Sequence, residues 1–299
     1  MKLKPATIYT VSTHNYKYGA FALINSVRNL GLNNPIVIGT DIHLPELENI
    51  EGVTQIILNS NWSGLNLKSV LILEHPAEHF IFFDADIILT HADFIPELER
   101  LLSLNKFVAC IDGIISQHEY RRSYWAKIYP FTNGNSSEHS WYYNSGFFAG
   151  VFSLHEKILS DWKEVSNKHL DPKAYLFDNP KLPMADQDTF NAVLQTMPLE
   201  ALVTIQMPDW RAISVHNHPF FHIGNFNPQA FLHCTDKNKS WTIKKAPARS
   251  PNAYDDLWYY YLFTNKHPVN CGLEISWGLK QWFQRTMISR VIIKLKNIF

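Results

Sequence analysis

Two aspartates interrupt the apolar run FIFFDADIILT at residues 80–90. Asp84 and Asp86 follow residues of a buried-strand type, and buried charges are costly unless they meet water, basic side chains or a metal ion. Two positions apart in an extended chain, their carboxylates point to the same side. Such a pair favours a cation between its members, and hard oxygen ligands suit magnesium or manganese. Strand-end solvation and basic side-chain partners are the alternative interpretations.

A second candidate lies in FLHCTDKNKSW, residues 231–241. Here His233 follows an apolar run, and Lys237, Lys239 and Trp241 come shortly after it. Lysines bind phosphate oxygens as point charges. The plainer alternatives are a packed or surface histidine and a solvated lysine.

The periodicity of apolar residues predicts the elements that position these groups. Strands are expected in ATIYTVST, PIVIGT, TQIILN, FIFFDAD, KFVACID and YYNSGFFAGVFSLH, and helices over 18–30, 67–74, 94–102, around 158–165 and from ADQDTFNAVL. This alternation indicates an α/β domain with a mainly parallel sheet. Ligands of such sheets bind beyond the carboxyl ends of the strands, where Asp84, Asp86 and Asp112 are expected.

Two polar and aromatic stretches show no clear period. Residues 113–143 are interpreted as a functional lid or binding loop. Residues 209–226 are rich in aromatic side chains and histidine, which suits sugar stacking and hydroxyl bonding. We favour that interpretation over a metal cluster of His216, His218 and His222, because no acids or cysteines lie nearby.

Composition limits the class of protein. The 299 residues are 46% apolar and contain 27 basic and 27 acidic side chains, so the chain is globular and balanced in charge. Three widely spaced cysteines argue against a disulfide framework and favour a reducing compartment. No secretory signal and no run of 18 apolar residues is found, so we expect neither export by that route nor a membrane span.

The last residues are basic. Between 276 and 299 there are five lysines and arginines and no acid, which leaves 22 basic against 27 acidic residues in the rest of the chain. Residues 277–299 predict a basic amphipathic helix that lies in a membrane interface. The alternative is a terminal helix packed on the body.

Five motifs in this order resemble the retaining glycosyltransferases of family 8, which include glycogenin and bacterial lipooligosaccharide galactosyltransferases. They are TVSTHNYKYGAFALINSV, FFDADIIL, YYNSGFFAG, ADQDTFN and the segment of His233, Lys239 and Trp241. In that segment Asp236 and Ser240 replace the family's glycine and proline. The resemblance covers about residues 6–245. It implies a GT-A domain over 1–245, and we assign 246–299 to a C-terminal extension with the helical tail.

The resemblance implies a divalent metal site and a nucleotide-sugar site. Asp84, Asp86 and His233 would ligate Mn²⁺ or Mg²⁺, and Lys239 would bind the phosphates of a UDP-sugar. Thr10 and Ser12 would hydrogen-bond uridine and Tyr16 would stack on it, although Thr10 could equally be an ordinary strand residue. The positions that line the donor sugar are Lys68, Asp112, Asn144, Ser145, Asp186 and Gln187. Asp188 is interpreted as a first-turn acid favoured by the helix dipole.

By this resemblance the chain is a metal-dependent retaining hexosyltransferase that moves glucose or galactose from UDP to a glycan or lipid-linked saccharide. This activity belongs to polysaccharide or lipopolysaccharide synthesis at the cytoplasmic membrane face, without nucleic acid as a partner. Gln187 matches the position that a double displacement would use, but an amide is a poor nucleophile. Front-face transfer is therefore favoured, with Asp186 kept as an alternative nucleophile.

Two other functions stay open. A nucleotidylyltransferase would be expected to carry a Gly-rich phosphate loop after the first strand, where STHNYKYGA has only Gly19. A module that binds a sugar nucleotide or glycan without turnover would explain the altered loop after His233.

Overall fold

The computed structural model describes residues 4–13, 16–116, 118–130, 139–173, 175–206, 230–235, 239–242, 253–263 and 267–271. A seven-stranded sheet has the order β3 (Val53–Ile57), β2 (Ile36–Thr40), β1 (Thr7–Ser12), β4 (His79–Phe83), β7 (Trp141–Val151), β6 (Phe107–Ile114), β8 (Leu202–Gln206). All except β7 run in the same direction. A separate antiparallel pair joins β5 (Ile87–Leu89) to β9 (Phe231–His233). The predicted α/β class with a mainly parallel sheet is confirmed.

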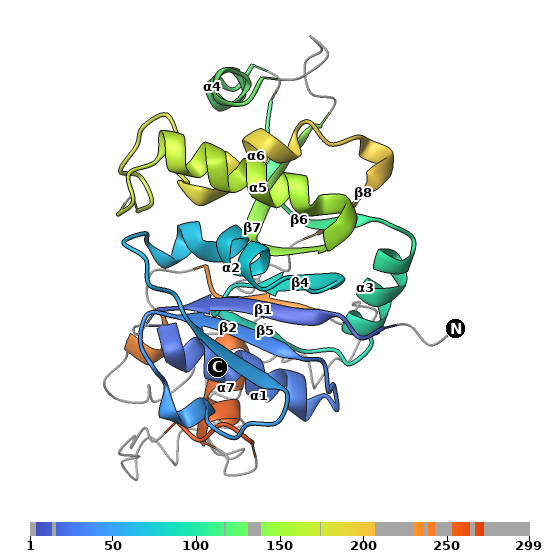
Figure 1. Cartoon of the computed structure of the whole chain (residues 1–299), viewed down its shortest axis with the longest axis vertical. Helices are drawn as coiled ribbons and strands as arrows, with labels where there is room; N and C mark the ends of the chain where they lie inside the picture. Colours follow the sequence, from blue (N-terminus) through green and yellow to red (C-terminus); the bar gives the residue numbers. More distant parts are fainter. Residues whose placement is uncertain are drawn as a thin grey trace, which may run out of the picture.

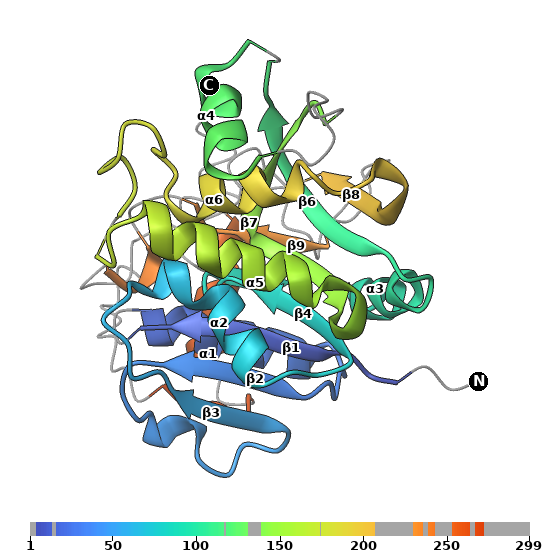
Figure 2. The ribbon, with the colours of Figure 1, turned by 45° about the horizontal axis from the view of Figure 1, so that its top comes forward.

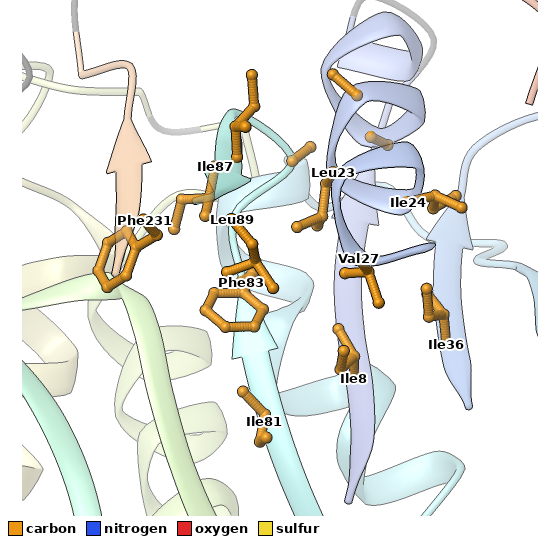
Figure 3. Close-up of a cluster of buried hydrophobic side chains, with 14 of the residues drawn as sticks. Ile8, Leu23, Ile24, Val27, Ile36, Ile81, Phe83, Ile87, Leu89 and Phe231 are labelled. Atoms are coloured by element: carbon orange, nitrogen blue, oxygen red, sulfur yellow. The ribbon is translucent and has the colours of Figure 1, made fainter. Parts of the chain in front are cut away.

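Helices cover both faces of the sheet (Figure 1). On one face lie α1 (Lys17–Asn29) and α7 (Ala253–Phe263), and on the other lie α2 (Lys68–Glu74), α5 (Phe152–His169) and α6 (Asp186–Leu194). The remaining helices are α3 (Phe94–Ser103) and α4 (Tyr120–Ile128), and the 3-10 turns include η3 (Gly64–Leu67). Figure 3 shows part of the hydrophobic core on the α1 side of the sheet, where apolar side chains of α1 face those of β1, β4 and β5. Burial of such side chains supplies the main stabilisation of the sheet.

The end of α1 shows why the helix predicted over residues 18–30 stops there. Gly31 has φ +75° and donates its N–H to the carbonyl of Arg28, and Leu32 donates to Val27. This pair of bonds is a Schellman motif, and glycine tolerates the left-handed conformation at low cost. Gly31 is therefore the C′ residue that ends α1.

Three local predictions need correction. The strand expected over FIFFDAD ends at Phe83, and β5 begins only at Ile87, so Asp84 and Asp86 lie between two strands. Residues 113–143 contain helix α4, so this segment is not entirely loop. The strand expected over YYNSGFFAGVFSLH ends at Val151, and the remaining residues form the first turn of α5. The buried residue Trp125 anchors α4 by stacking on Tyr142, although the hydrophobic periodicity of the segment is weak.

Most apolar residues of α7, together with Val269 and Cys271, belong to the core on the α1 side of the sheet. Asn25 of α1 donates to the carbonyls of Tyr261 and Val269 at 3.0 and 2.9 Å, and it accepts the N–H of Val269. Trp258 of α7 donates its indole N–H to the carbonyl of Tyr18. The division at residue 245 stays a prediction, since residues 243–252 lie outside the described part.

The three cysteines are free and buried, in agreement with the absence of a disulfide framework. Among the described helices, none has the length and apolar character needed to cross a bilayer. The predicted amphipathic helix at 277–299 lies outside the described residues.

The buried His155 is expected to make the folded state less stable at acidic pH. Its ring is buried and accepts the N–H of Val151 at 2.9 Å, and burial lowers the pKa of His155 to about 4. As the pH falls below about 6.5, His155 becomes protonated in the unfolded chain but stays neutral in the folded protein. The free energy of unfolding therefore decreases as the pH drops from 6.5 towards 4. The free energy of unfolding in urea should be about 2 kcal/mol lower at pH 5 than at pH 7 from this group alone.

The His155→Gln variant keeps an acceptor for Val151 and removes the titrating ring. Its loss of stability between the same two pH values should therefore be smaller than that of the wild type. An equal loss in both proteins would assign the acid sensitivity to other groups.

Candidate functional site

The Asp84–Asp86 segment is a turn held from two sides. Asp84 donates its N–H to the carbonyl of Gly146 in β7 at 2.7 Å, and Cys234 after β9 donates to the carbonyl of Asp86 at 3.0 Å. The carbonyl of Asp84 accepts the N–H of Ile87, which closes the turn. The two carboxylates therefore converge through turn geometry and not through the extended-chain alternation expected from the sequence.

The turn meets His233 from β9. Ligand atoms of Asp84, Asp86 and His233 all lie within 4.8 Å of one another. His233 Nε2 is 3.2 Å from Asp86 Oδ1 and 3.8 Å from Asp84 Oδ2, while its buried Nδ1 has no partner among the described residues. Two carboxylate oxygens and one imidazole nitrogen form a donor set that fits a divalent ion of the manganese or magnesium type.

Two buried lysines flank the carboxylates. Lys68, at the start of α2, lies 2.8 Å from Asp84 Oδ1 and 3.0 Å from Asp186 Oδ2. Lys239 lies 2.6 Å from Asp86 Oδ2 and also donates to the carbonyl of Cys234. Basic partners, one of the alternatives for the two aspartates, are thus present together with the His233 cluster. Three carboxylates against two lysines leave this cluster with one net negative charge, which favours a further cation.

Burial and these ion pairs act in opposite directions on the pKa values. Burial raises the pKa of Asp84, and the nearby Lys68 reduces that rise. For Asp86 burial also raises the pKa, but Lys239 and His233 together outweigh it and hold the pKa well below its usual range. Burial lowers the pKa of Lys68, but the neighbouring carboxylates of Asp186 and Asp84 together raise it by more. The net pKa of Lys68 therefore lies above its ordinary value, and the amine stays charged.

The first turn of α6 closes the site on the side of β6 and β7. Asp186 Oδ2 accepts the hydroxyl proton of Ser145 at 2.8 Å, and Gln187 Oε1 accepts the Ser145 N–H at 3.3 Å. Gln187 Nε2 donates to Asp112 Oδ2 at 3.0 Å. Polar contacts therefore connect Asp112, through α6 and Lys68, to the carboxylate and histidine cluster.

The backbone that presents Asp186 is strained. Ala185 has φ +44° and ψ −111°, a conformation that L residues rarely adopt. Asp188 accepts the N–H of Met184 at 2.8 Å and the hydroxyl of Tyr142 at 3.1 Å, and it is fully buried. Burial raises the pKa of Asp188 to about 6. The buried contacts show that Asp188 also ties α6 to β7, in addition to the helix-dipole role predicted for it.

The predicted uridine residues lie at the carboxyl end of β1. Thr10 and Ser12 are buried, and Thr10 Oγ1 has no partner among the described residues. Tyr16 packs edge-on against Trp241, with ring centroids 5.5 Å apart, and Lys239 Nζ lies 5.8 Å from its ring centre. Tyr16 is thereby connected to the carboxylate and histidine cluster, whereas no described contact joins Thr10 or Ser12 to it.

Gly146 and Asn191, for which the sequence suggested no role, also shape this site. Asn144 Oδ1 accepts the N–H of Gly146, and a side chain at Gly146 would meet His233 and Asp84. Asn191 of α6 bonds both backbone groups of Tyr143, at 2.8 and 2.7 Å, which fixes α6 to β7. Gly146 lies in the motif YYNSGFFAG and Asn191 in ADQDTFN. Their contacts, however, form only when elements that are distant in the sequence come together. Residues 209–226 and 236–238 lie outside the described part.

Gly146 provides a direct test of the cluster. A Cβ at this position would lie 2.5 Å from His233 Cε1 and 2.7 Å from Asp84 Oδ2. The Gly146→Ala variant should therefore displace the ligand atoms and weaken Mn²⁺ binding by about tenfold or more, measured by electron paramagnetic resonance titration. Gly113→Ala is the matched control, since a Cβ there meets nothing within 4 Å. Equal Mn²⁺ affinity in both variants would argue against this ligand set.

Comparison with known proteins identifies the fold. No protein-family model and no curated protein matches this chain. Among solved structures, the apo form of WbbM, a bifunctional glycosyltransferase, matches with a TM-score of 0.56 at 14% identity, over 86% of this chain and 49% of that one. The chain thus spans about half the length of that structure.

Two further structures agree. The glycosyltransferase GlyE of Streptococcus pneumoniae TIGR4 matches with a TM-score of 0.51 at 12% identity, over 86% of this chain and 60% of that one. An active-site mutant of LgtC matches with a TM-score of 0.50 at 17% identity, over 84% and 94% of the two chains. At such low identity the likeness shows a shared fold, which is the GT-A glycosyltransferase fold expected from the sequence motifs.

Proposed function

We propose that this chain is a metal-dependent retaining hexosyltransferase of the family 8 type, which moves glucose or galactose from a UDP-sugar to a glycan or lipid-linked saccharide. The observation that carries the proposal is the convergence of Asp84, Asp86 and His233 beside two buried lysines in a glycosyltransferase fold. A fold alone does not determine an activity. The site adds a cation-binding donor set and fixed positive charge, which suit a diphosphate leaving group.

In this proposal each site residue has a role in binding the metal ion or one part of the UDP-sugar. Asp84, Asp86 and His233 would hold Mn²⁺ or Mg²⁺, which stabilises the negative charge that develops on UDP when the anomeric C–O bond breaks. Lys239 would bind phosphate oxygens, and Thr10, Ser12 and Tyr16 would bind the uridine. The donor sugar would contact Lys68, Asp112, Asn144, Ser145, Asp186 and Gln187, where charged and amide groups meet its hydroxyls.

The contacts of Gln187 and Asp186 favour front-face transfer. Both ends of the Gln187 amide are engaged, by Ser145 and by Asp112, and a neutral amide is a weak nucleophile. Asp186 is engaged by Lys68 and Ser145, which reduces the availability of its carboxylate for attack. In this mechanism the departing phosphate oxygen accepts the acceptor's proton while Gln187 supports the positively charged sugar. Asp186 stays the alternative nucleophile.

The proposed setting of the reaction concerns two segments that lie outside the described residues. We propose that residues 209–226 contribute aromatic surface for the acceptor, and that residues 277–299 attach the protein peripherally to the cytoplasmic face of the membrane. This attachment would bring a lipid-linked glycan within reach and place the activity in polysaccharide or lipopolysaccharide synthesis.

One observation favours a second candidate, a sugar-nucleotide-binding module without turnover. Lys239 Nζ lies 2.6 Å from Asp86 Oδ2, so the amine competes with a metal ion for this carboxylate. In the transferase, Lys239 would have to move from Asp86 to the phosphates when donor and metal bind.

The experiment that separates the two candidates is release of UDP from a panel of UDP-sugars with Mn²⁺, since slow donor hydrolysis needs no knowledge of the acceptor. Release from one sugar only, abolished by EDTA, supports the transferase. If UDP binds in a Mn²⁺-dependent way but no sugar is consumed, with or without added saccharides, the binding module is favoured. Absence of any UDP binding contradicts both candidates.

A further inference from the structure

The segment that carries Lys239 is held by helix α7. Ser240, which follows Lys239 in the chain, donates its hydroxyl proton to a carboxylate oxygen of Asp255. Both side chains are buried, with 1% of Ser240 and 4% of Asp255 exposed. A buried pair of this kind resists separation, because each group would lose a partner without gaining a water molecule. The backbone next to Lys239 is therefore tied to α7, although Ser240 and Asp255 are 15 positions apart.

Trp241 connects the same segment to two helices. Its ring centroid lies 6.2 Å from that of Trp258 in α7, whose indole N–H donates to the carbonyl of Tyr18. Trp241 also lies against α1, since a Cβ at Gly19 would be 2.7 Å from its Cη2 atom. Helix α7 packs on α1 (Figure 1), on the face of the sheet opposite to α2 and α5, which lie in front of the sheet in Figure 2. The ring of Trp241 is thus fixed by contacts with both α1 and α7.

Lys239 and Trp241 are the residues through which this segment reaches the candidate site. Lys239 Nζ lies 2.6 Å from Asp86 Oδ2, and Trp241 packs edge-on against Tyr16. Ser240 lies between them in the chain and is bonded to α7. A shift of Ser240 would therefore move both neighbours, the proposed phosphate-binding amine and the ring that supports Tyr16.

The residue type at position 240 explains why this contact matters. Ser240 is the first residue of a short 3-10 turn over Ser240–Thr242. Proline, which the resembled motif has at this position, would restrict φ to the range that such a turn needs. Serine imposes no such restriction, so the turn requires another constraint. The hydrogen bond to Asp255 supplies that constraint from outside the segment.

We infer that Asp255 is a positioning residue of the donor site. By holding Ser240, it keeps Lys239 in place for the diphosphate of a UDP-sugar. The same contact keeps Trp241 beside the ring on which the uridine is proposed to stack. Helix α7 is thus a working part of the donor site, and a protein that ends at residue 245 would lack it. This inference deepens the proposed function and rests on it, because it assigns the phosphates to Lys239.

Calorimetric titration of UDP in the presence of Mn²⁺ tests the inference. Asp255→Ala removes the acceptor of the Ser240 hydroxyl, and the dissociation constant of UDP should rise about tenfold or more. Asp255→Asn keeps an acceptor oxygen in the same place and should recover most of the wild-type affinity. In a Lys239→Met background, Asp255→Ala should cause a smaller loss, because the amine that it positions is already absent.

Leu262→Ala is the control for a role in folding alone. Leu262 is a buried residue near the end of α7 and belongs to the core on the α1 side of the sheet. Its truncation should lower the melting temperature and leave the dissociation constant of UDP unchanged. An equal loss of affinity in Leu262→Ala and Asp255→Ala, or wild-type affinity in Asp255→Ala, would overturn the inference.

Hydrogen–deuterium exchange without ligand separates this inference from the proposed function. The backbone amides of residues 239–242 should exchange faster in Asp255→Ala than in the wild type. Unchanged exchange in Asp255→Ala would show that Asp255 does not hold the segment, and would overturn the inference. If exchange increases as expected but the wild type binds no UDP, the contact is established and the proposed function fails, and with it the role of Asp255 in a donor site.

Discussion

Asp86→Asn is expected to reduce Mn²⁺-dependent release of UDP from the accepted sugar nucleotide by about a hundredfold or more. Asp86 is buried and contacts both His233 and Lys239, and its carboxylate is held ionised by them. The amide keeps the shape of the side chain but removes the negative charge that attracts a divalent ion. EDTA added to the wild type should give a loss of the same size, because both treatments remove the cation from the leaving group.

Asp93→Asn serves as the matched control. Asp93 precedes α3, its side chain is 89% exposed, and it makes no side-chain cap bond. This variant should retain wild-type turnover. A full rate in Asp86→Asn, or an EDTA-insensitive rate in the wild type, would contradict the role of this carboxylate in metal binding.

Lys68→Met is expected to destabilise the folded state by about 3–5 kcal/mol, measured as the free energy of unfolding in urea. The side chain of Lys68 is only 3% exposed, and it neutralises Asp84 and Asp186 at the same time. Methionine has a similar length but leaves the two carboxylates without their shared cation. The loss comes mostly from these uncompensated charges.

Two further variants isolate this effect. In the Lys68→Met/Asp186→Asn double variant, part of the lost stability should return, because one of the unpaired charges is removed. Lys4→Met removes a lysine from an exposed pair with Glu78 and should leave the unfolding curve unchanged. If the double variant is less stable than Lys68→Met alone, charge compensation is not the main role of Lys68.

The carboxylate and histidine cluster was predictable from the chain to a large extent. Asp84, Asp86 and His233 form the expected cluster, and Lys239 lies beside it. The signal was chemical, since carboxylates after an apolar strand need a compensating partner wherever the strand is placed. The two-residue alternation used for their direction was wrong in detail, because a turn replaces the strand at Ala85.

Other features had no usable signal in a single sequence. Helix α4 is stabilised by the stacking of Trp125 on Tyr142, a contact between separate segments, while its own apolar periodicity is weak. The requirement for glycine at position 146 arises from the approach of His233 and Asp84 to β7. Neither effect can be read from neighbouring residues, because both depend on which elements meet.

The amino-acid sequence by itself determined the alternation of strands and helices, the Gly31 stop of α1 and the presence of acids at the carboxyl ends of strands. These features follow from local periodicity, backbone preference and the cost of burying charge. Only the tertiary structure decided which charges meet. Asp86 and Lys239 are 153 positions apart and become an ion pair because β9 aligns beside β5.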